Sequence, residues 1–260
     1  MKIIYWNVNN NKKALEILSS SDSVFEHKIL AFSEYWDIFN EIKELIGNYN
    51  IWYDPIYKRT GLIYSQDAII NFLGNQQYFS HFKFEYNDIQ ILLFILHCKS
   101  QIESYEDAYR NTQYTQQEIK RIILKTNIKH VIILGDFNLP HYNEVFRNVF
   151  NFNCLNYFNS DDNEYKVYER NQYLKFYNPI AALSGDKSIG PSGTYHYNKR
   201  TEAQSWFIFD QILVSYPLSI YLSKKGCEIL SSLGGHHLLT RKKLPNKKYS
   251  DHLPIRIEFD

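Results

Sequence analysis

The chain has 260 residues, with 29 basic and 28 acidic side chains and a formal net charge of +1. This balance excludes electrostatic binding of nucleic acid by the whole protein surface, although a local basic groove could still bind it. The longest apolar runs, at residues 91–96 and 131–134, are too short to span a bilayer. The three widely spaced cysteines form no CxxC pair, so we expect neither a disulfide framework nor a zinc site. We therefore expect a soluble cytoplasmic protein without a membrane partner.

Apolar runs and helical periodicity predict an irregular alternation of strands and helices. We expect strands at residues 2–7, 29–33, 61–64, 68–73, 78–86, 90–97 and 131–134, and helices at residues 12–20, 35–46 and 104–125. The polar stretch at residues 151–192 predicts long loops with a short helix, and further strands are expected at residues 194–197, 211–215, 227–230 and 255–259. Strands outnumber helices, which indicates an α/β sandwich in a single domain over residues 1–260.

Polar side chains stand where several of these strands begin or end. They are Asn7, Glu34, His97, Asp136, Asn138, Asp210, Asp251 and His252. Strand ends of an α/β protein gather at one edge, and the loops there carry function more often than the scaffold does. Carboxylate and amide oxygens suit a hard cation such as Mg²⁺, while carboxylates and histidines supply acid–base groups for hydrolysis. Taken singly, each residue is equally well explained by a turn, a cap or a packed core position.

Six segments, in this order along the chain, resemble the endonuclease/exonuclease/phosphatase superfamily, the metal-dependent phosphoesterases related to pancreatic deoxyribonuclease. The segments are residues 5–7 (YWN), 32–34 (FSE), 96–100 (LHCKS), 135–138 (GDFN), 209–215 (FDQILVS) and 250–255 (SDHLPI). GDFN and SDHLP are specific, whereas the first two segments alone would be weak. The resemblance implies a four-layer sandwich in which two packed, mostly antiparallel β-sheets are flanked by helices.

The resemblance also implies a metal site. Glu34 matches the carboxylate that ligates the divalent cation, Mg²⁺ with Mn²⁺ as a substitute. Asn7 and Asp251 match residues that complete or support this site. Asp136 matches the residue that orients or deprotonates the attacking water.

The remaining matched residues imply contacts with the phosphate. Asn138 matches a donor that holds the phosphoryl group, and His252 matches the histidine beside the scissile phosphate, with Asp210 as its carboxylate partner. Such a carboxylate fixes the tautomer of the ring and stabilises imidazolium. His97 matches a second histidine, which bonds a phosphate oxygen or helps to protonate the leaving group. The chain departs from many relatives in having Ile208-Phe209, and no arginine, just before Asp210.

Candidate substrate-binding residues are basic. Arg110 follows the 96–100 segment where relatives often carry a substrate-facing arginine. A basic loop precedes the 250–255 segment and consists of Arg241, Lys242, Lys243, Lys247 and Lys248. On the rim of an active site these cations would bind the flanking phosphates of a polyanion, and the alternative is a solvated loop.

The sequence therefore predicts a Mg²⁺-dependent phosphodiesterase. The preferred hypothesis is a nuclease that hydrolyses DNA or RNA by direct water attack. The alternatives are a phosphatase or lipid phosphodiesterase acting on inositol phosphates, nucleotides or sphingomyelin, and a non-catalytic binding module of the same fold. Because no recognition module accompanies the domain, we also expect the protein to work within a larger assembly, for example a genome-defence complex.

Overall fold

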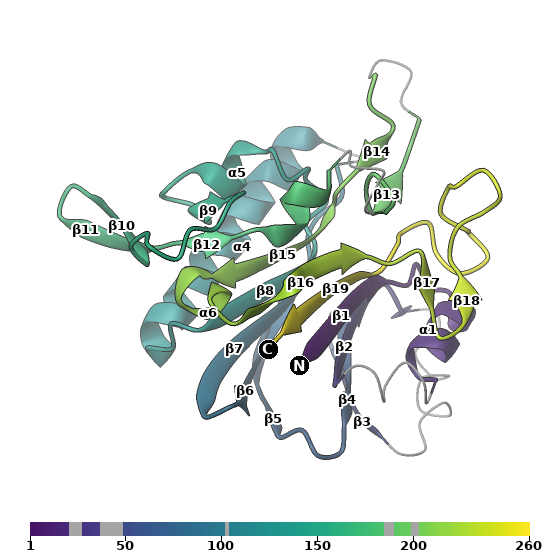
Figure 1. Cartoon of the computed structure of the whole chain (residues 1–260), viewed down its shortest axis with the longest axis horizontal. Helices are drawn as coiled ribbons and strands as arrows, with labels where there is room; N and C mark the ends of the chain where they lie inside the picture. Colours follow the sequence, from purple (N-terminus) through teal and green to yellow (C-terminus); the bar gives the residue numbers. More distant parts are fainter. Residues whose placement is uncertain (21–27, 37–48, 102–103, 185–189, 199–202) are drawn as a thin grey trace.

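The computed structural model describes residues 1–20, 28–36, 49–101, 104–184, 190–198 and 203–260. Two large β-sheets pack face to face, with the two chain termini side by side at one end of the sandwich (Figure 1). The helix expected at residues 35–46 lies almost entirely outside the described residues.

The first sheet has six strands and contains both ends of the chain. In spatial order they are β16 (Leu222–Ile229), β19 (Ile255–Phe259), β1 (Lys2–Asn7), β2 (Ile29–Ser33), β4 (Thr60–Ser65) and β3 (Tyr49–Tyr53). The β1–β2 pair is parallel and the other pairs are antiparallel. β1 and β2 therefore end at the same edge of the sheet.

The second sheet has seven strands. In spatial order they are β5 (Ile70–Gln76), β6 (Phe79–Tyr86), β7 (Ile89–His97), β8 (Val131–Asp136), β15 (Asp210–Ser215), β12 (Phe176–Tyr177) and β9 (Cys154–Leu155). The β7–β8 and β9–β12 pairs are parallel, and the others are antiparallel. Residues 131–134 of β8 are β-branched or leucine, and the whole strand is buried, as its central position in the sheet requires.

Two apolar clusters hold the layers together. The larger one lies between the sheets and includes the buried residues of α1 (Lys12–Leu18), and the smaller one joins the outer face of the seven-stranded sheet to α4 (Tyr105–Thr126) and α5 (Glu144–Arg147). The N-cap of α4 is Ser104, whose hydroxyl accepts from the Asp107 N–H, and its C-cap is Asn127 in the left-handed conformation. None of the described helices is long and apolar enough to cross a membrane. The predicted sandwich of two mostly antiparallel sheets with flanking helices is confirmed.

The main differences from the expected elements are in segments with no distinct buried face. β3 was not expected, because all five of its residues are half-buried and show no alternation. Residues 151–192 were expected to form loops, yet they contain a hairpin of β10 (Tyr165–Tyr168) and β11 (Asn171–Leu174) that projects from the body (Figure 1). The short helix expected there is the 3₁₀ helix η2 (Pro179–Leu183).

Smaller elements surround the end of the sandwich where β1 and β8 finish. β13 (Tyr195–His196) pairs with β14 (Trp206–Phe207), and β17 (Ser232–Leu233) pairs with β18 (His236–His237). Figure 1 shows β13, β14 and the loop after β18 rising from this end, away from the two chain termini. α6 (Tyr216–Ser219) directly follows β15 and lies at the opposite end, where the Val131 N–H at the start of β8 donates to Ser215 Oγ.

Gly135 is required by the close approach of β8 to β7. Its φ is +150°, and a Cβ built on it would lie 2.1 Å from the backbone oxygen of Leu96. Gly135→Ala should therefore lower the free energy of unfolding by about 3 kcal/mol or more, because the clash is with backbone that cannot move aside. Urea denaturation checks this, with Gly190→Ala as the control, since a Cβ there meets nothing closer than 3.6 Å. An unchanged midpoint for Gly135→Ala would contradict the prediction.

Candidate active site

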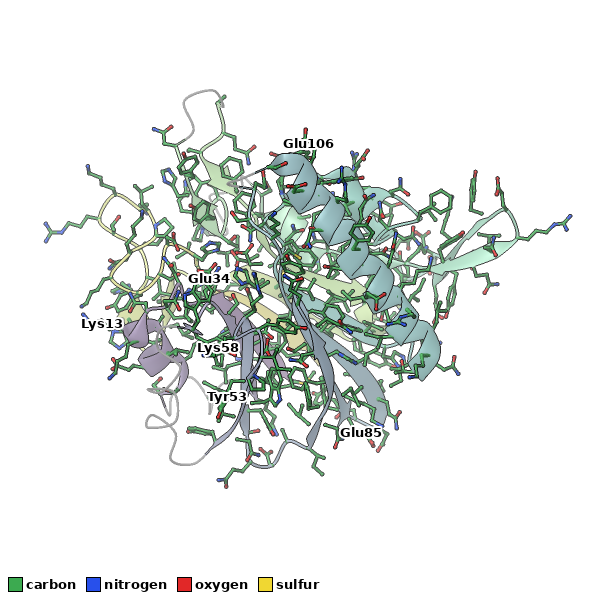
Figure 2. All side chains as sticks on the ribbon, turned by 180° about the vertical axis from the view of Figure 1, so that it is seen from behind. Lys13, Glu34, Tyr53, Lys58, Glu85 and Glu106 are labelled. Atoms are coloured by element: carbon green, nitrogen blue, oxygen red, sulfur yellow. The ribbon has the colours of Figure 1, made fainter. Side chains whose placement is uncertain are left out.

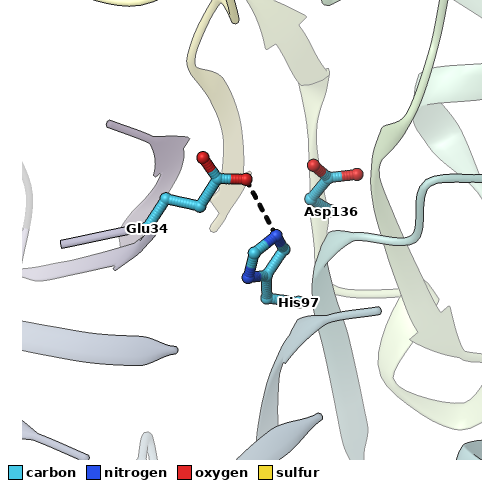
Figure 3. Close-up of side chains that lie close together, drawn as sticks. All are labelled: Glu34, His97 and Asp136. Atoms are coloured by element: carbon cyan, nitrogen blue, oxygen red, sulfur yellow. Dashed lines mark ion pairs between the residues drawn. The ribbon is translucent and has the colours of Figure 1, made fainter. Parts of the chain in front are cut away.

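Strand register brings the polar residues together at one end of the sandwich. The parallel β1–β2 pair places Asn7 opposite Ser33, directly before Glu34. In the other sheet the β7–β8 pair places His97 opposite Asp136, and the β8–β15 pair places Asp210 opposite the same Asp136. Because the two sheets pack face to face, these strand ends meet across the sandwich, and Figure 3 shows Glu34 facing His97 and Asp136.

Glu34, His97 and Asp136 form a compact cluster (Figure 3). His97 Nε2 lies 2.9 Å from Glu34 Oε1. The Asn7 side-chain amide bridges the two carboxylates, because its Nδ2 lies 3.0 Å from Glu34 Oε1 and 3.0 Å from Asp136 Oδ2. Asn7 Oδ1 accepts from the backbone N–H of Asn9, so the nitrogen and not the oxygen faces the carboxylates. Asn7 thus holds the two carboxylates in place.

The charge state of this cluster suits a cation. Burial alone would raise the pKa of Glu34, but hydrogen bonds from His97 and Asn7 lower it to about 2, so this carboxylate is ionised at neutral pH. The pKa of Asp136 is raised, first by burial and then by the negative charge of Asp210. Ligand atoms of Glu34, His97 and Asp136 lie within 4.8 Å of one another. Two carboxylates at this spacing fit a divalent cation, and their oxygen donors suit Mg²⁺.

A second cluster pairs Asp210 with His252. His252 Nδ1 lies 2.7 Å from Asp210 Oδ2, and His252 Nε2 lies 3.9 Å from Asp136 Oδ2. Burial lowers the pKa of His252, but the adjacent Asp210 outweighs it, so the net shift is upward. The imidazolium form is therefore favoured, with Nδ1 occupied by Asp210 and Nε2 directed towards Asp136.

The 250–253 segment is fixed to the end of β1. Ser250 Oγ donates to the Asn7 carbonyl at 2.7 Å and accepts from the His252 N–H at 3.0 Å. Trp6 Nε1 donates to the His252 carbonyl at 2.9 Å. The Tyr195 ring packs on His252 with the centroids 4.7 Å apart. The histidine is thus oriented by backbone and side-chain contacts from both halves of the chain.

Asn138 sits in the turn that follows β8, with φ at 51°. Its backbone N–H donates to Asp136 Oδ1 at 2.8 Å, and its Nδ2 donates to the Cys98 carbonyl at 3.0 Å. Gln101 Nε2 in turn donates to the Asn138 carbonyl. An amide nitrogen carries two hydrogens, so the second remains for a phosphate oxygen.

The other predicted residues lie outside these two clusters. Asp251 Oδ1 accepts from Asn9 Nδ2 at 2.9 Å, so it is linked to Asn7 through Asn9 and is not among the three-residue ligand groups of the described chain. Arg110 is exposed in the second turn of α4. The basic loop is exposed at every one of its five cations, namely Arg241, Lys242, Lys243, Lys247 and Lys248. Its end is tied to the site, because the Lys248 carbonyl accepts from Asn11 Nδ2 and Ser250 bonds Asn7.

Tyr5 is a site residue to which the sequence pattern assigned no role. Its hydroxyl accepts from the Asp136 N–H at 2.9 Å and lies 2.6 Å from Ser33 Oγ, so it joins the two sheets beneath the carboxylates. The available signal was strand alternation, since residues 5 and 7 of one strand point to the same face. Arg59 was also missed, although its carbonyl accepts from the Glu34 N–H at 3.3 Å.

The fold and the site define a phosphoesterase of the metal-dependent hydrolase class. The model of the Endonuclease/Exonuclease/phosphatase family matches residues 4–252, and the chain belongs to this family. No curated protein is similar enough in sequence to give a match.

Solved structures of the same fold cover almost the whole chain. Truncated TDP2 from Caenorhabditis elegans is 15% identical with a TM-score of 0.58, covering 98% of this chain and 95% of its own. A mannosyl-6-phosphatase from Bacteroides thetaiotaomicron is 14% identical with a TM-score of 0.57, covering 100% and 99%. TDP2 from D. rerio, solved with a single-strand DNA product, is 14% identical with a TM-score of 0.57, covering 100% and 98%. At these identities the likeness concerns the fold, and it includes proteins that act on different phosphoesters.

Proposed function

We propose that the protein is a nuclease that hydrolyses phosphodiester bonds of DNA or RNA, with Mg²⁺ as its cofactor and Mn²⁺ as a substitute. The observation that carries the proposal is the meeting of the Glu34 cluster and the Asp210–His252 pair at one end of the sandwich, beside a loop with five exposed cations. These cations can bind the flanking phosphates of a polymer, and a small phosphate monoester has no flanking phosphates.

In this proposal Glu34 and Asp136 hold the divalent cation, which supplies positive charge next to the phosphate when it is bound. Asp251 supports the site through Asn9 and Asn7. Asp136 orients the attacking water and accepts its proton. The new bond joins the water oxygen to phosphorus, and the bond to the leaving oxygen breaks.

The histidines and Asn138 act on the phosphate. His252 carries its proton at Nε2, held there by Asp210 on the other ring nitrogen, and donates it to a phosphate or leaving oxygen. Asn138 donates its second amide hydrogen to the phosphoryl group. His97 Nε2 is engaged with Glu34, so in the absence of substrate it fixes that carboxylate, and its contact with phosphate remains a prediction.

A substrate panel tests the choice of nuclease over phosphatase. Single- and double-stranded DNA and RNA would be compared with mannose 6-phosphate, an inositol phosphate and sphingomyelin, each with Mg²⁺, Mn²⁺ or EDTA. Cleavage of a polymer at a higher kcat/KM than any small ester is expected. Hydrolysis of a monoester with no cleavage of any polymer would overturn the proposal and favour the phosphatase alternative, for which the Bacteroides relative is the precedent.

The basic loop should contribute binding energy through phosphate contacts. Changing Lys242 and Lys247 together to glutamine should weaken binding of single-stranded oligonucleotide and reduce the slope of log K against log salt by about 0.7 for each phosphate that is no longer bound. The matched control changes Lys125 and Lys166, on α4 and β10, in the same way. Equal effects of the two double variants would show that only net charge matters and that the loop is merely solvated.

A further inference from the structure

The Glu34–His97 side of the site presents an exposed aromatic ring. Trp36 is 42% exposed, and its ring lies nearly parallel to that of His97, with the centroids 6.5 Å apart and an interplanar angle of 14°. The preceding residue, Tyr35, is fully buried and its hydroxyl donates to the Thr60 carbonyl at 2.9 Å. The backbone before Trp36 is thus fixed while the indole remains open to solvent. An indole in this position offers an apolar, flat surface directly beside the most polar part of the molecule.

The same side of the site also carries a positioned arginine. The Arg59 guanidinium lies 4.9 Å from the centroid of the Tyr78 ring. Within the described part of the chain, no carboxylate forms an ion pair with Arg59. Its backbone carbonyl accepts from the Glu34 N–H, and the Tyr78 carbonyl accepts from the His97 N–H at 2.9 Å. Arg59 therefore places a positive charge near Glu34 and His97 of the Glu34–His97–Asp136 cluster.

The position of Arg59 differs from that of the basic loop. Its charge acts on Cys98, lowering the pKa of that thiol against the larger effect of burial. The Cys98 carbonyl accepts from Asn138, so Cys98 adjoins the Asn138 turn. The basic loop, by contrast, is tied at Lys248 to Asn11, the N-cap of α1, and the Ser250 that follows it bonds Asn7 at the end of β1.

We propose that Trp36 and Arg59 form a single-nucleotide subsite on the Glu34–His97 side, where Trp36 stacks on an unpaired nucleobase and Arg59 binds an adjacent phosphate. This inference rests on the proposed nuclease function and deepens it, because the bases of a single strand present open faces on which an indole can stack. The substrate is accordingly single-stranded nucleic acid or an unpaired end. A sugar phosphate or a phospholipid headgroup offers no flat ring for Trp36.

Binding in EDTA tests the subsite without turnover. The probes are a fluorescent single-stranded hexanucleotide and the same hexanucleotide made entirely of abasic residues. Trp36→Ala should weaken binding of the first probe by about tenfold, the equivalent of about 1.4 kcal/mol, and leave binding of the abasic probe unchanged. Trp36→Phe, which retains a ring, should restore most of the affinity. Tyr114→Ala is the matched control, since Tyr114 is 61% exposed on α4, outside the described site.

Arg59 has its own signature in the same assay. Arg59→Gln should weaken binding of both probes by a similar factor and reduce the salt slope by the equivalent of about one phosphate, because phosphate is present in both probes. Arg121→Gln, on the exposed face of α4, is the control. Equally weakened binding of both probes by Trp36→Ala, or unchanged binding of both, would overturn base stacking. An unchanged salt slope in Arg59→Gln would overturn the phosphate contact.

The outcomes separate this inference from the proposed function. Cleavage of single strands by the wild-type protein, with a Trp36→Ala variant that binds both probes normally, overturns the subsite alone. Failure to cleave any polymer, with a base-dependent weakening of binding in Trp36→Ala, overturns the nuclease proposal and retains the subsite. If the wild-type protein binds neither probe, the subsite is overturned, whether or not the protein cleaves a polymer.

Discussion

Replacing His252 with alanine should lower the turnover number by about 10²–10⁴-fold, the usual contribution of a positioned acid–base group. The reason is the pairing of its Nδ1 with Asp210 at 2.7 Å, which keeps Nε2 protonated and directed towards Asp136. Steady-state kinetics at saturating substrate measure the effect. KM should change much less than kcat, because the interaction strengthens as the leaving oxygen gains charge.

Two further variants distinguish a loss of catalysis from a loss of folding. Asp210→Asn keeps the size of the side chain and removes the charge, so it should also reduce kcat while the thermal transition stays close to that of the wild type. His237→Ala is the control, because His237 is exposed on β18. A His252→Ala protein that turns over at the wild-type rate would remove His252 from the mechanism.

Replacing Glu34 with glutamine should abolish tight binding of Mg²⁺ and lower turnover by on the order of 10³-fold, because a bound metal contributes several kcal/mol to stabilising charge on the phosphate. Glu34 is the carboxylate whose pKa lies at about 2, so it is fully ionised in the cluster. Its backbone is also strained, with φ at 55°, and such strain is common where a side chain must be aimed precisely. Glutamine keeps the shape and removes only the charge.

Isothermal titration with Mg²⁺ or Mn²⁺ measures metal binding independently of activity. Glu85→Gln is the matched control, because Glu85 is exposed on β6 at the far end of the sandwich from Glu34, as Figure 2 shows. Equal metal affinity in Glu34→Gln and in the wild type would place the cation elsewhere, with the Asp136–Asp210–His252 group as the next candidate.

The sequence was most informative where short motifs contain the candidate site residues. GDFN and the segment around His252 located residues from β8 and the end of the chain that the fold brings to within 3.9 Å of each other. Continuous apolar runs located β7 and β8 because both are buried on each face. The order of the family segments therefore predicted which residues lie close together before any contact between them was known.

What the sequence did not reveal are contacts that depend on three-dimensional proximity. The hydroxyl of Tyr5 reaches Asp136 across 131 positions of the chain, and no local pattern indicates such a pair. Trp36 and Arg59 belong to ordinary-looking segments and acquire a role only beside His97 and Tyr78. The β10–β11 hairpin was missed because it buries little, so the apolar alternation that predicts a strand is absent.

The most direct test of the account is the hydrolysis of a labelled single-stranded oligonucleotide by wild-type protein and by Glu34→Gln, each with Mg²⁺ and with EDTA. We expect cleavage by the wild type with Mg²⁺, none with EDTA, and a rate about 10³-fold lower in the variant. Cleavage that persists in EDTA, or a variant as active as the wild type, would contradict a metal site built on Glu34. No cleavage under any condition would contradict the assignment of nucleic acid as the substrate.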